Sequence, residues 1–233
     1  MLTLDKNHSM YNYVYYCSEL FAIGIIYFLI IPYNKLFVAI GILYMAFIIF
    51  FFRNLYIDKS GYDENLNGMV TPSSGDVIGI FDYDNVGANV GGRMIQTHVN
   101  VWNRHYFVSP CDGVIANIEE RNVVATDAER VIITIIPKNH NHPHHDRVSL
   151  VSTDVIRIEP IVCKFGNPAW LPTCFFKRIM VNCKVGDEVK RGEKLGMIRF
   201  GSRMETRLPK SYKLNVNVGD RLDVGESFLA FSN

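Results

Sequence analysis

The chain has few cysteines and no large excess of either charge, and both absences narrow what it can be. Its 233 residues include five cysteines, an odd number, and no two of them have the C-x-x-C spacing. This usage argues against a disulfide scaffold and a structural zinc site, and it is typical of a reducing compartment. The formal net charge is +1 and no basic patch dominates, so we expect no nucleic-acid partner.

Long apolar runs are missing from most of the chain but gather near its start. Leu36 to Phe52 (LFVAIGILYMAFIIFFF) carries no charge, and a second run covers Leu20 to Ile31. A membrane-spanning helix needs about 20 apolar residues, with a lower limit of about 17. We therefore predict an N-terminal helical membrane hairpin within residues 1–55; a buried hairpin of a soluble protein is the alternative. Arg53 and Lys59 favour the cytoplasmic side for the residues after the hairpin.

Beyond Arg53 the sequence changes character. Residues 56–68 are polar and turn-rich, which indicates a linker. Residues 69–233 consist of short β-branched runs separated by Gly, Pro, Asn and Asp, and this pattern predicts a mainly β domain of the barrel or sandwich type. The clearest runs are Val77 to Ile80, Val114 to Ile118, Val131 to Ile136 and Lys213 to Val218. Phe175 to Val181 fits a short helix or another strand.

Two pairs of segments echo each other. TPSSGDVIGI (Thr71 to Ile80) is similar to SPCDGVIANI (Ser109 to Ile118), and V-G-D-x-[VL]-x-x-G-E occurs from Val185 and again from Val218. Gly-Asp favours a tight turn, because Gly accepts φ > 0 and Asp can bond its own backbone. We therefore expect two related hairpins, one on each side of Gly201-Ser202. The predicted fold is therefore a barrel- or sandwich-like β domain that contains two hairpins of the hybrid-motif type.

Three stretches together resemble a known family. KVGDEVKRGEKLGMIRFGSRMETRLP (Lys184 to Pro209), VWNRHYFVSPCDGVI (Val101 to Ile115) and the apolar hairpin ending in Phe-Phe-Arg are similar to the phosphatidylserine decarboxylases. The resemblance is to the short, membrane-hairpin proenzymes of that family. It implies conversion of phosphatidylserine to phosphatidylethanolamine and CO2, with a phospholipid substrate and a membrane as partners.

The resemblance also implies self-cleavage between Gly201 and Ser202. Ser202 would be the nucleophile and the precursor of a covalent pyruvoyl group, and Gly201 would supply the attacked carbonyl. A β-chain of residues 1–201 and an α-chain of residues 202–233 would then stay associated. His105 matches the family histidine by its spacing to Pro110 and Gly113. His98 competes with His105 for this role, but its spacing does not match.

The sequence departs from the family at one important position. The family usually carries Asp in an S-P-A-D-G segment, where it orients or activates the histidine, and this chain has Ser74 instead. A serine holds no formal charge, so a carboxylate–histidine pair is lost there. Asp76 or Asp112 could substitute. A second departure is LPTCFFKRIM (Leu171 to Met180).

Other signals fit a second or third function less well. Four histidines lie within KNHNHPHHD (Lys138 to Asp146), but the prolines around them indicate a loop, so we expect no specific metal site. Gly87 to Gly92 lacks a phosphate-binding motif. An unprocessed, degenerate relative with a binding or structural role remains the alternative to the enzyme. A lipoyl- or biotinyl-type carrier would need a lysine at a hairpin tip, and Lys210 is too far along the chain.

Overall fold

The computed structural model describes Gly24 and residues 35–51, 53, 57–83, 91–123, 128–138, 155–163, 179–198 and 202–232. The chain divides into two compact units, Met1–Tyr56 and Ile57–Asn233. Each unit is described by itself.

The first unit contains the helix α2 (Lys35–Phe51), which covers nearly all of the longer apolar run. The other arm of the predicted hairpin, Leu20 to Ile31, lies outside the described residues apart from Gly24. In the part of the chain that is described, no helix is long and apolar enough to cross a membrane. The predicted membrane hairpin is therefore not confirmed.

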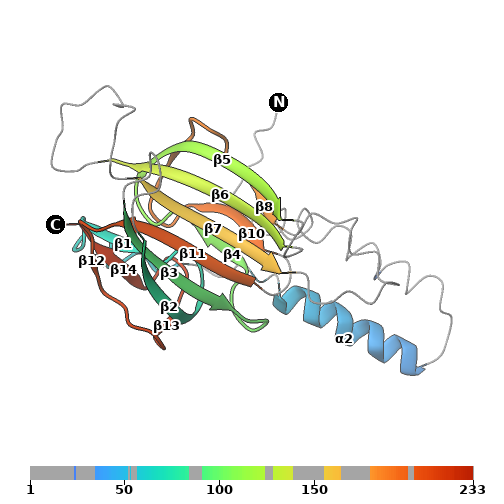
Figure 1. Ribbon diagram of the computed structural model, residues 1–233. Helices are drawn as coiled ribbons and strands as arrows, with labels where there is room; N and C mark the ends of the chain where they lie inside the picture. The colour runs from blue at the N-terminus through green and yellow to red at the C-terminus, as the bar shows by residue number, and fades with distance from the viewer. Residues whose placement is uncertain are drawn as a thin grey trace, which may run out of the picture. The chain divides into compact units, whose positions relative to one another are not determined.

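The second unit is built from strands, which confirms a mainly β fold. Its long strands curl into a half-barrel (Figure 1). The strands are β1 (Gly68–Val70), β2 (Gly75–Tyr83), β3 (Gly92–Val99), β4 (Tyr106–Val108), β5 (Gly113–Val123), β6 (Ala128–Pro137), β7 (Ile156–Cys163), β8 (Ile179–Val181), β9 (Glu188–Val189), β10 (Lys194–Ile198), β11 (Ser202–Pro209), β12 (Lys213–Leu214), β13 (Arg221–Leu222) and β14 (Phe228–Phe231).

The strand order reveals an internal duplication. The eight-stranded sheet runs β13-β2-β3-β11-β7-β6-β5-β9, and two small sheets run β1-β14-β12 and β4-β10-β8. Each half of the large sheet contributes one V-G-D hairpin strand, one long hairpin and one central strand. We call strands β4 to β10 the inserted half and the remaining strands the outer half. The inserted half is continuous in sequence, and it interrupts the outer half between β3 and β11.

Reciprocal hydrogen bonds confirm that the halves are equivalent. The Val70 N–H donates to the Pro110 carbonyl at 3.0 Å, and the Val108 N–H donates to the Pro72 carbonyl, also at 3.0 Å. Pro72 and Pro110 lie in the segments that echo each other in sequence, 38 positions apart, and Val70 and Val108 directly precede those segments. The weak similarity of TPSSGDVIGI and SPCDGVIANI therefore reflects the same local structure in both halves.

The two V-G-D hairpins are also built alike. Gly186 and Gly219 have φ angles of 91° and 98°, a region that favours glycine. The carboxylate of Asp187 accepts a hydrogen bond from the Lys184 N–H at 2.8 Å, and Asp220 accepts one from the Asn217 N–H at 2.7 Å. The prediction of tight Gly-Asp turns is correct, and the aspartates close them.

The core lies inside the curled sheet and is filled mainly by β-branched residues, which suit a pleated surface. The largest fully buried side chains are Phe107, Ile95, Ile115, Ile133, Ile135, Ile156, Ile158, Ile161 and Ile179. The runs at Val77, Val114 and Val131 are strands as predicted. The run from Lys213 is a strand only as far as Leu214, and the end of the ambiguous segment forms β8.

Candidate functional site

The two connections between the halves start and end at paired residues. The first leaves from Val99, the last residue of β3, and the second arrives at Ser202, the first residue of β11. Val99 and Ser202 are partners in the β3–β11 register. At the other ends of these connections, Tyr106 of β4 is the partner of Met197 of β10. The Gly201–Ser202 bond thus belongs to the connection that returns the chain to the outer half; Gly201 itself lies outside the described residues.

His105 lies on the first connection, directly before β4. Its side chain is buried, with 1% of its surface exposed. Its carbonyl accepts a hydrogen bond from the Ile198 N–H at 2.7 Å. Ile198 precedes Ser202 by four residues, which span at most about 14 Å of chain. The main chain at His105 is therefore tied to within that length of Ser202.

The competing histidine has a different environment. His98 lies in β3 and is exposed. Its partners in the neighbouring strands are Arg203 of β11 and Asp76 of β2. His98 therefore sits on the outward face of the sheet among charged residues, one register position from the Val99–Ser202 pair.

A short turn joins β3 to His105, and two asparagines hold it. The Asn103 side-chain oxygen accepts a hydrogen bond from the Asn100 N–H at 2.9 Å, and the Asn100 side-chain oxygen accepts one from the Trp102 N–H at 2.9 Å. The next residue, Arg104, forms an ion pair with Glu226 at 2.8 Å. These contacts fix the path of the chain between Ser202's partner strand and His105.

The structure explains what Ser74 does in place of the family aspartate. Its hydroxyl oxygen accepts a hydrogen bond from the Val224 N–H at 2.9 Å. In the inserted half, Asp112 makes the equivalent bond with the Arg191 N–H at 2.8 Å. The same backbone position thus accepts either a serine or an aspartate. Ser74 keeps the hydrogen bond that closes the hairpin but brings no charge.

The two aspartates considered as substitutes lie elsewhere in the register. Asp76 faces His98, not His105, across β2 and β3. Asp112 accepts a hydrogen bond from the Arg191 N–H in the hairpin of the inserted half. Sequence proximity to Ser74 suggested Asp76, but the alternation of side chains along β2 directs it with His98 to the outward face.

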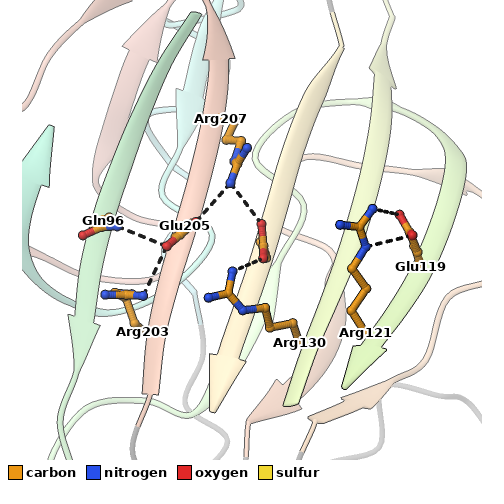
Figure 2. Close-up of polar contacts among 8 residues, drawn as sticks. Gln96, Glu119, Arg121, Arg130, Arg203, Glu205 and Arg207 are labelled. Atoms are coloured by element: carbon orange, nitrogen blue, oxygen red, sulfur yellow. Dashed lines mark hydrogen bonds and ion pairs between the residues drawn. The ribbon is translucent and has the colours of Figure 1, made fainter. Parts of the chain in front are cut away.

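An Arg–Glu network covers the outward face of the central strands (Figure 2). Glu205 of β11 and Glu159 of β7 are register partners, and each carboxylate is buried under arginines. Arg207 contacts both, at 3.3 Å to Glu205 and 3.4 Å to Glu159. Further contacts come from Arg203 at 3.4 Å and Gln96 at 3.1 Å to Glu205, and from Arg130 at 3.0 Å to Glu159.

This network explains the alternating charges after Ser202. Arg203, Glu205 and Arg207 all point to one face of β11, and β7 repeats the pattern with Arg157 and Glu159. Sequence reasoning missed the glutamate of β7, although the R-x-E spacing shared by the two strands was a usable signal. The network locks the strand that begins at Ser202 onto its neighbour.

The two cysteines whose side chains the structure describes, Cys111 and Cys183, are poor nucleophiles. Burial raises the pKa of the Cys111 thiol to about 12 and that of Cys183 to about 11, so both stay protonated at neutral pH. No cluster of potential metal ligands occurs in the described part of the chain. The histidine tract at 138–146 lies outside the described residues except for Lys138. Residues 87–90 of the loop from Gly87 to Gly92 and residues 171–178 of the altered segment also lie outside them.

Known proteins resemble this chain over most of its length. The family description "Phosphatidylserine decarboxylase" matches residues 47–230, which include every strand of the second unit apart from the last residue of β14. A phosphatidylserine decarboxylase proenzyme of Geotalea uraniireducens is 27% identical over 195 residues, or 84% of each chain. The corresponding proenzyme of Paraburkholderia xenovorans is 24% identical over 189 residues, or 81% of each.

A third relative differs in its named substrate. A protein of Methanococcoides burtonii, named as a putative archaetidylserine decarboxylase proenzyme, is 29% identical over 149 residues. The match spans 61% of this chain and 61% of that protein. The family match, the Gly201-Ser202 junction and the paired connections around it agree with one another, and the chain belongs to the phosphatidylserine decarboxylase family.

Proposed function

We propose that the chain is a self-processing decarboxylase that converts phosphatidylserine to phosphatidylethanolamine and CO2. The observation that carries this proposal is the pairing of the two connections between the halves. It holds the buried His105 near the strand that begins at Ser202. The family relation supplies the reaction type.

Self-processing would begin with attack of the Ser202 hydroxyl on the Gly201 carbonyl. The Ser202 amide becomes an ester, and loss of the Ser202 α-proton then expels the Gly201 carboxylate by β-elimination. Water replaces the freed nitrogen, which leaves as ammonia, and residue 202 becomes a pyruvoyl group. A base must take the hydroxyl proton. We assign this proton transfer to His105, because it is buried and tethered through Ile198.

The position of Ser202 suits a covalent group at a new chain end. Ser202 opens β11, which lies between β3 and β7 in the middle of the large sheet. A pyruvoyl group there supplies a carbonyl that accepts the electrons released when CO2 is lost. His105 would return a proton to the substrate carbon. Its burial excludes bulk water from that transfer.

The interleaved halves support association of the two chains after cleavage. The α-chain would contain β11, which pairs with β3 and β7, as well as β13 and β14, which pair with β2 and β1. All four partner strands belong to the β-chain. Cutting at residue 201 breaks none of these ladders, so the chains should co-purify without a disulfide.

We also propose that the first unit attaches the enzyme to a membrane, with the β unit on the cytoplasmic side. Support comes from α2, which is uncharged after Lys35 and exposes large apolar side chains over about half of its circumference. These are Val38, Ile40, Ile42, Leu43, Phe47, Ile49 and Phe50. A helix that is apolar on all sides needs a protein core or a lipid phase around it. Fractionation of full-length protein and of a variant lacking residues 1–53 tests this.

One observation favours the degenerate relative as a second function. Ser74 brings no carboxylate to the position where the family usually has one, and its hydroxyl is engaged by Val224. Intact mass spectrometry separates the two functions. The enzyme should yield two fragments divided at 201/202 and release CO2 from phosphatidylserine. A single 26.6 kDa species with no CO2 release after long incubation would favour the degenerate relative.

A further inference from the structure

The turn between β3 and His105 presents two adjacent apolar side chains to solvent. Val101 is 43% exposed and Trp102 is 67% exposed. Single exposed apolar residues are common on protein surfaces. A neighbouring valine and tryptophan on one turn are less so, because burying a tryptophan is worth more than burying almost any other side chain.

The turn is rigid rather than loosely extended. Asn100 and Asn103 bond it internally through both side chains, and the Asn103 N–H also donates to the Asn100 carbonyl at 3.1 Å. Asn103 is itself buried, with 6% exposed. The fold therefore holds Val101 and Trp102 outward, and binding through these side chains needs no further loss of conformational entropy to order the turn.

The location of the turn links it to the candidate active site. It begins one residue after Val99, the register partner of Ser202. Next to that pair, His98 and Arg203 lie opposite each other on the outward face. Tryptophan is enriched at the interface of a bilayer. Asp76 and Glu205 balance the basic residues at this edge, so the choice of a phosphatidylserine bilayer follows from the proposed substrate.

We propose that Val101 and Trp102 insert into the interfacial layer of a phosphatidylserine-containing bilayer. The insertion sets the start of β11 at the level of the lipid headgroups. The choice of lipid rests on the proposed function, but insertion itself requires neither cleavage nor turnover. A second copy of the chain is the other possible occupant of this surface, and the experiment below distinguishes it from a bilayer.

The fold provides a matched control at the opposite end of the large sheet. Val185, at the tip of the inserted half's hairpin, is 59% exposed. The Gly186 N–H beside it donates to the Ile115 carbonyl near the start of β5. The antiparallel ladders place the start of β5 beside the end of β6, the end of β6 beside the start of β7, and the start of β7 beside the end of β11. The start of β5 therefore lies at the end of the sheet where β11 finishes. A tryptophan introduced at this position is thus equally accessible but far from Ser202.

The test measures the depth of one tryptophan in lipid. Trp170→Phe leaves Trp102 as the only tryptophan, because the chain has two. Ser202→Ala keeps the chain uncut, so the measurement does not depend on catalysis. The control adds Trp102→Phe and Val185→Trp to the same background. Both full-length proteins are reconstituted into phosphatidylcholine vesicles, with and without phosphatidylserine, that carry bromine at a shallow acyl position.

We expect strong quenching of Trp102 in the phosphatidylserine vesicles and weaker quenching without phosphatidylserine. The single tryptophan of the Val185→Trp control should show little quenching in either. Equal quenching of both tryptophans, or of neither, would overturn the proposal. So would quenching of Trp102 that ignores phosphatidylserine. An emission shift that depends on protein concentration and not on lipid would assign the turn to a second copy instead.

An activity measurement separates this proposal from the proposed function. In the cleavable chain, Trp102→Ser should lower the ratio of activity on bilayer phosphatidylserine to activity on a dispersed short-chain analogue by about tenfold, equivalent to ~1.4 kcal/mol. Val185→Ser should leave the ratio unchanged. Quenching without any decarboxylation would refute only the proposed function, whereas decarboxylation without quenching would refute only the insertion.

Discussion

The outer and inserted halves share a strand order, but they differ at the start of their central strands. β11 begins with Ser202 and β7 begins with Ile156, and each strand continues with the R-x-E pattern whose glutamates are register partners. The inserted half thus places an inert side chain where the outer half places the proposed nucleophile. Under the proposed function, the shared scaffold does not account for cleavage by itself; the residue types and the neighbouring connection have to account for it.

The largest effect should come from exchanging these residue types one at a time. Ser202→Ala removes the hydroxyl, so we expect a single uncut chain of 26.6 kDa and no decarboxylation. Ile156→Val at the equivalent position should cost about 1 kcal/mol of stability and leave cleavage intact. Intact mass and thermal unfolding of both variants give the answer. Cleavage persisting in Ser202→Ala would show that a different bond is cut.

The second comparison is between the two histidines near the start of β11. His105→Ala should reduce decarboxylation by about 10²- to 10⁴-fold, the usual worth of a general acid or base. His98→Ala should have a small effect, because His98 is exposed on the outward face. Rates are compared at equal extents of cleavage, so that processing and turnover are separated. A larger loss for His98→Ala would reverse the assignment.

The halves also differ in how they hold the segment before β1. Arg191 of the inserted half is buried, and its guanidinium donates to the carbonyls of Tyr62, Asn65 and Gly68 at 2.6 Å. The equivalent position in the outer half is Val224, which is fully buried. One half therefore anchors the entering chain by hydrogen bonds, and the other fills the same place with an apolar side chain.

Arg191→Met tests this anchor. It strands three carbonyl groups, so we expect a loss of about 3 kcal/mol in the free energy of unfolding. The neighbouring Lys190→Met is the control; Lys190 is exposed, and its change should stay within about 0.5 kcal/mol. Urea titration measures both. Equal stabilities would mean that water replaces the guanidinium without loss.

Local patterns in the sequence predicted the turns and hairpins better than the contacts between residues far apart in the chain. The V-G-D signature predicted both hairpins, because glycine at positive φ and a turn-closing aspartate act within four residues. The bond between Ser74 and Val224 joins residues 150 positions apart, and no local pattern encodes it. The same is true of the Glu159–Glu205 pair, which depends on the insertion that makes β7 and β11 neighbours. For His105, spacing to Pro110 and Gly113 suggested a role, but its tether to Ile198 required the fold.

Ser74 gives a more moderate test of the comparison between halves. Asp112 shows that a carboxylate can accept the equivalent hairpin N–H, so Ser74→Asp should preserve the bond to Val224. We expect the added charge to shorten the half-time of self-cleavage several-fold by restoring the family's carboxylate. Ser74→Ala should lose the bond, cost about 1 kcal/mol, and not accelerate cleavage. Faster cutting in both variants would attribute the effect to loosening instead of charge.

The smallest expected effect concerns Lys194 of β10, whose counterpart 33 positions later is Ser227. Burial, with the nearby charges of Lys59 and Arg104, lowers the pKa of Lys194 to about 8, and its ammonium lies 4.8 Å from the centre of the Tyr106 ring. The unfolded chain, with a pKa near 10.5, binds more protons between these values, so the contribution of Lys194 to stability should rise as the pH increases from 8 to about 10. Because the ammonium is partly exposed, solvent screening should limit this rise to about 1 kcal/mol. The raised pKa values of the Cys111 and Cys183 thiols act in the opposite direction above about pH 9, and that of Tyr62, about 12, does so above pH 10, so the contribution of Lys194 is measured as the difference between wild type and Lys194→Met. Lys194→Met should abolish the rise, and Lys213→Met, at an exposed site of β12, should retain it. Unfolding curves at pH 8 and pH 10 that change equally in wild type and Lys194→Met would refute the assignment of this linkage to Lys194.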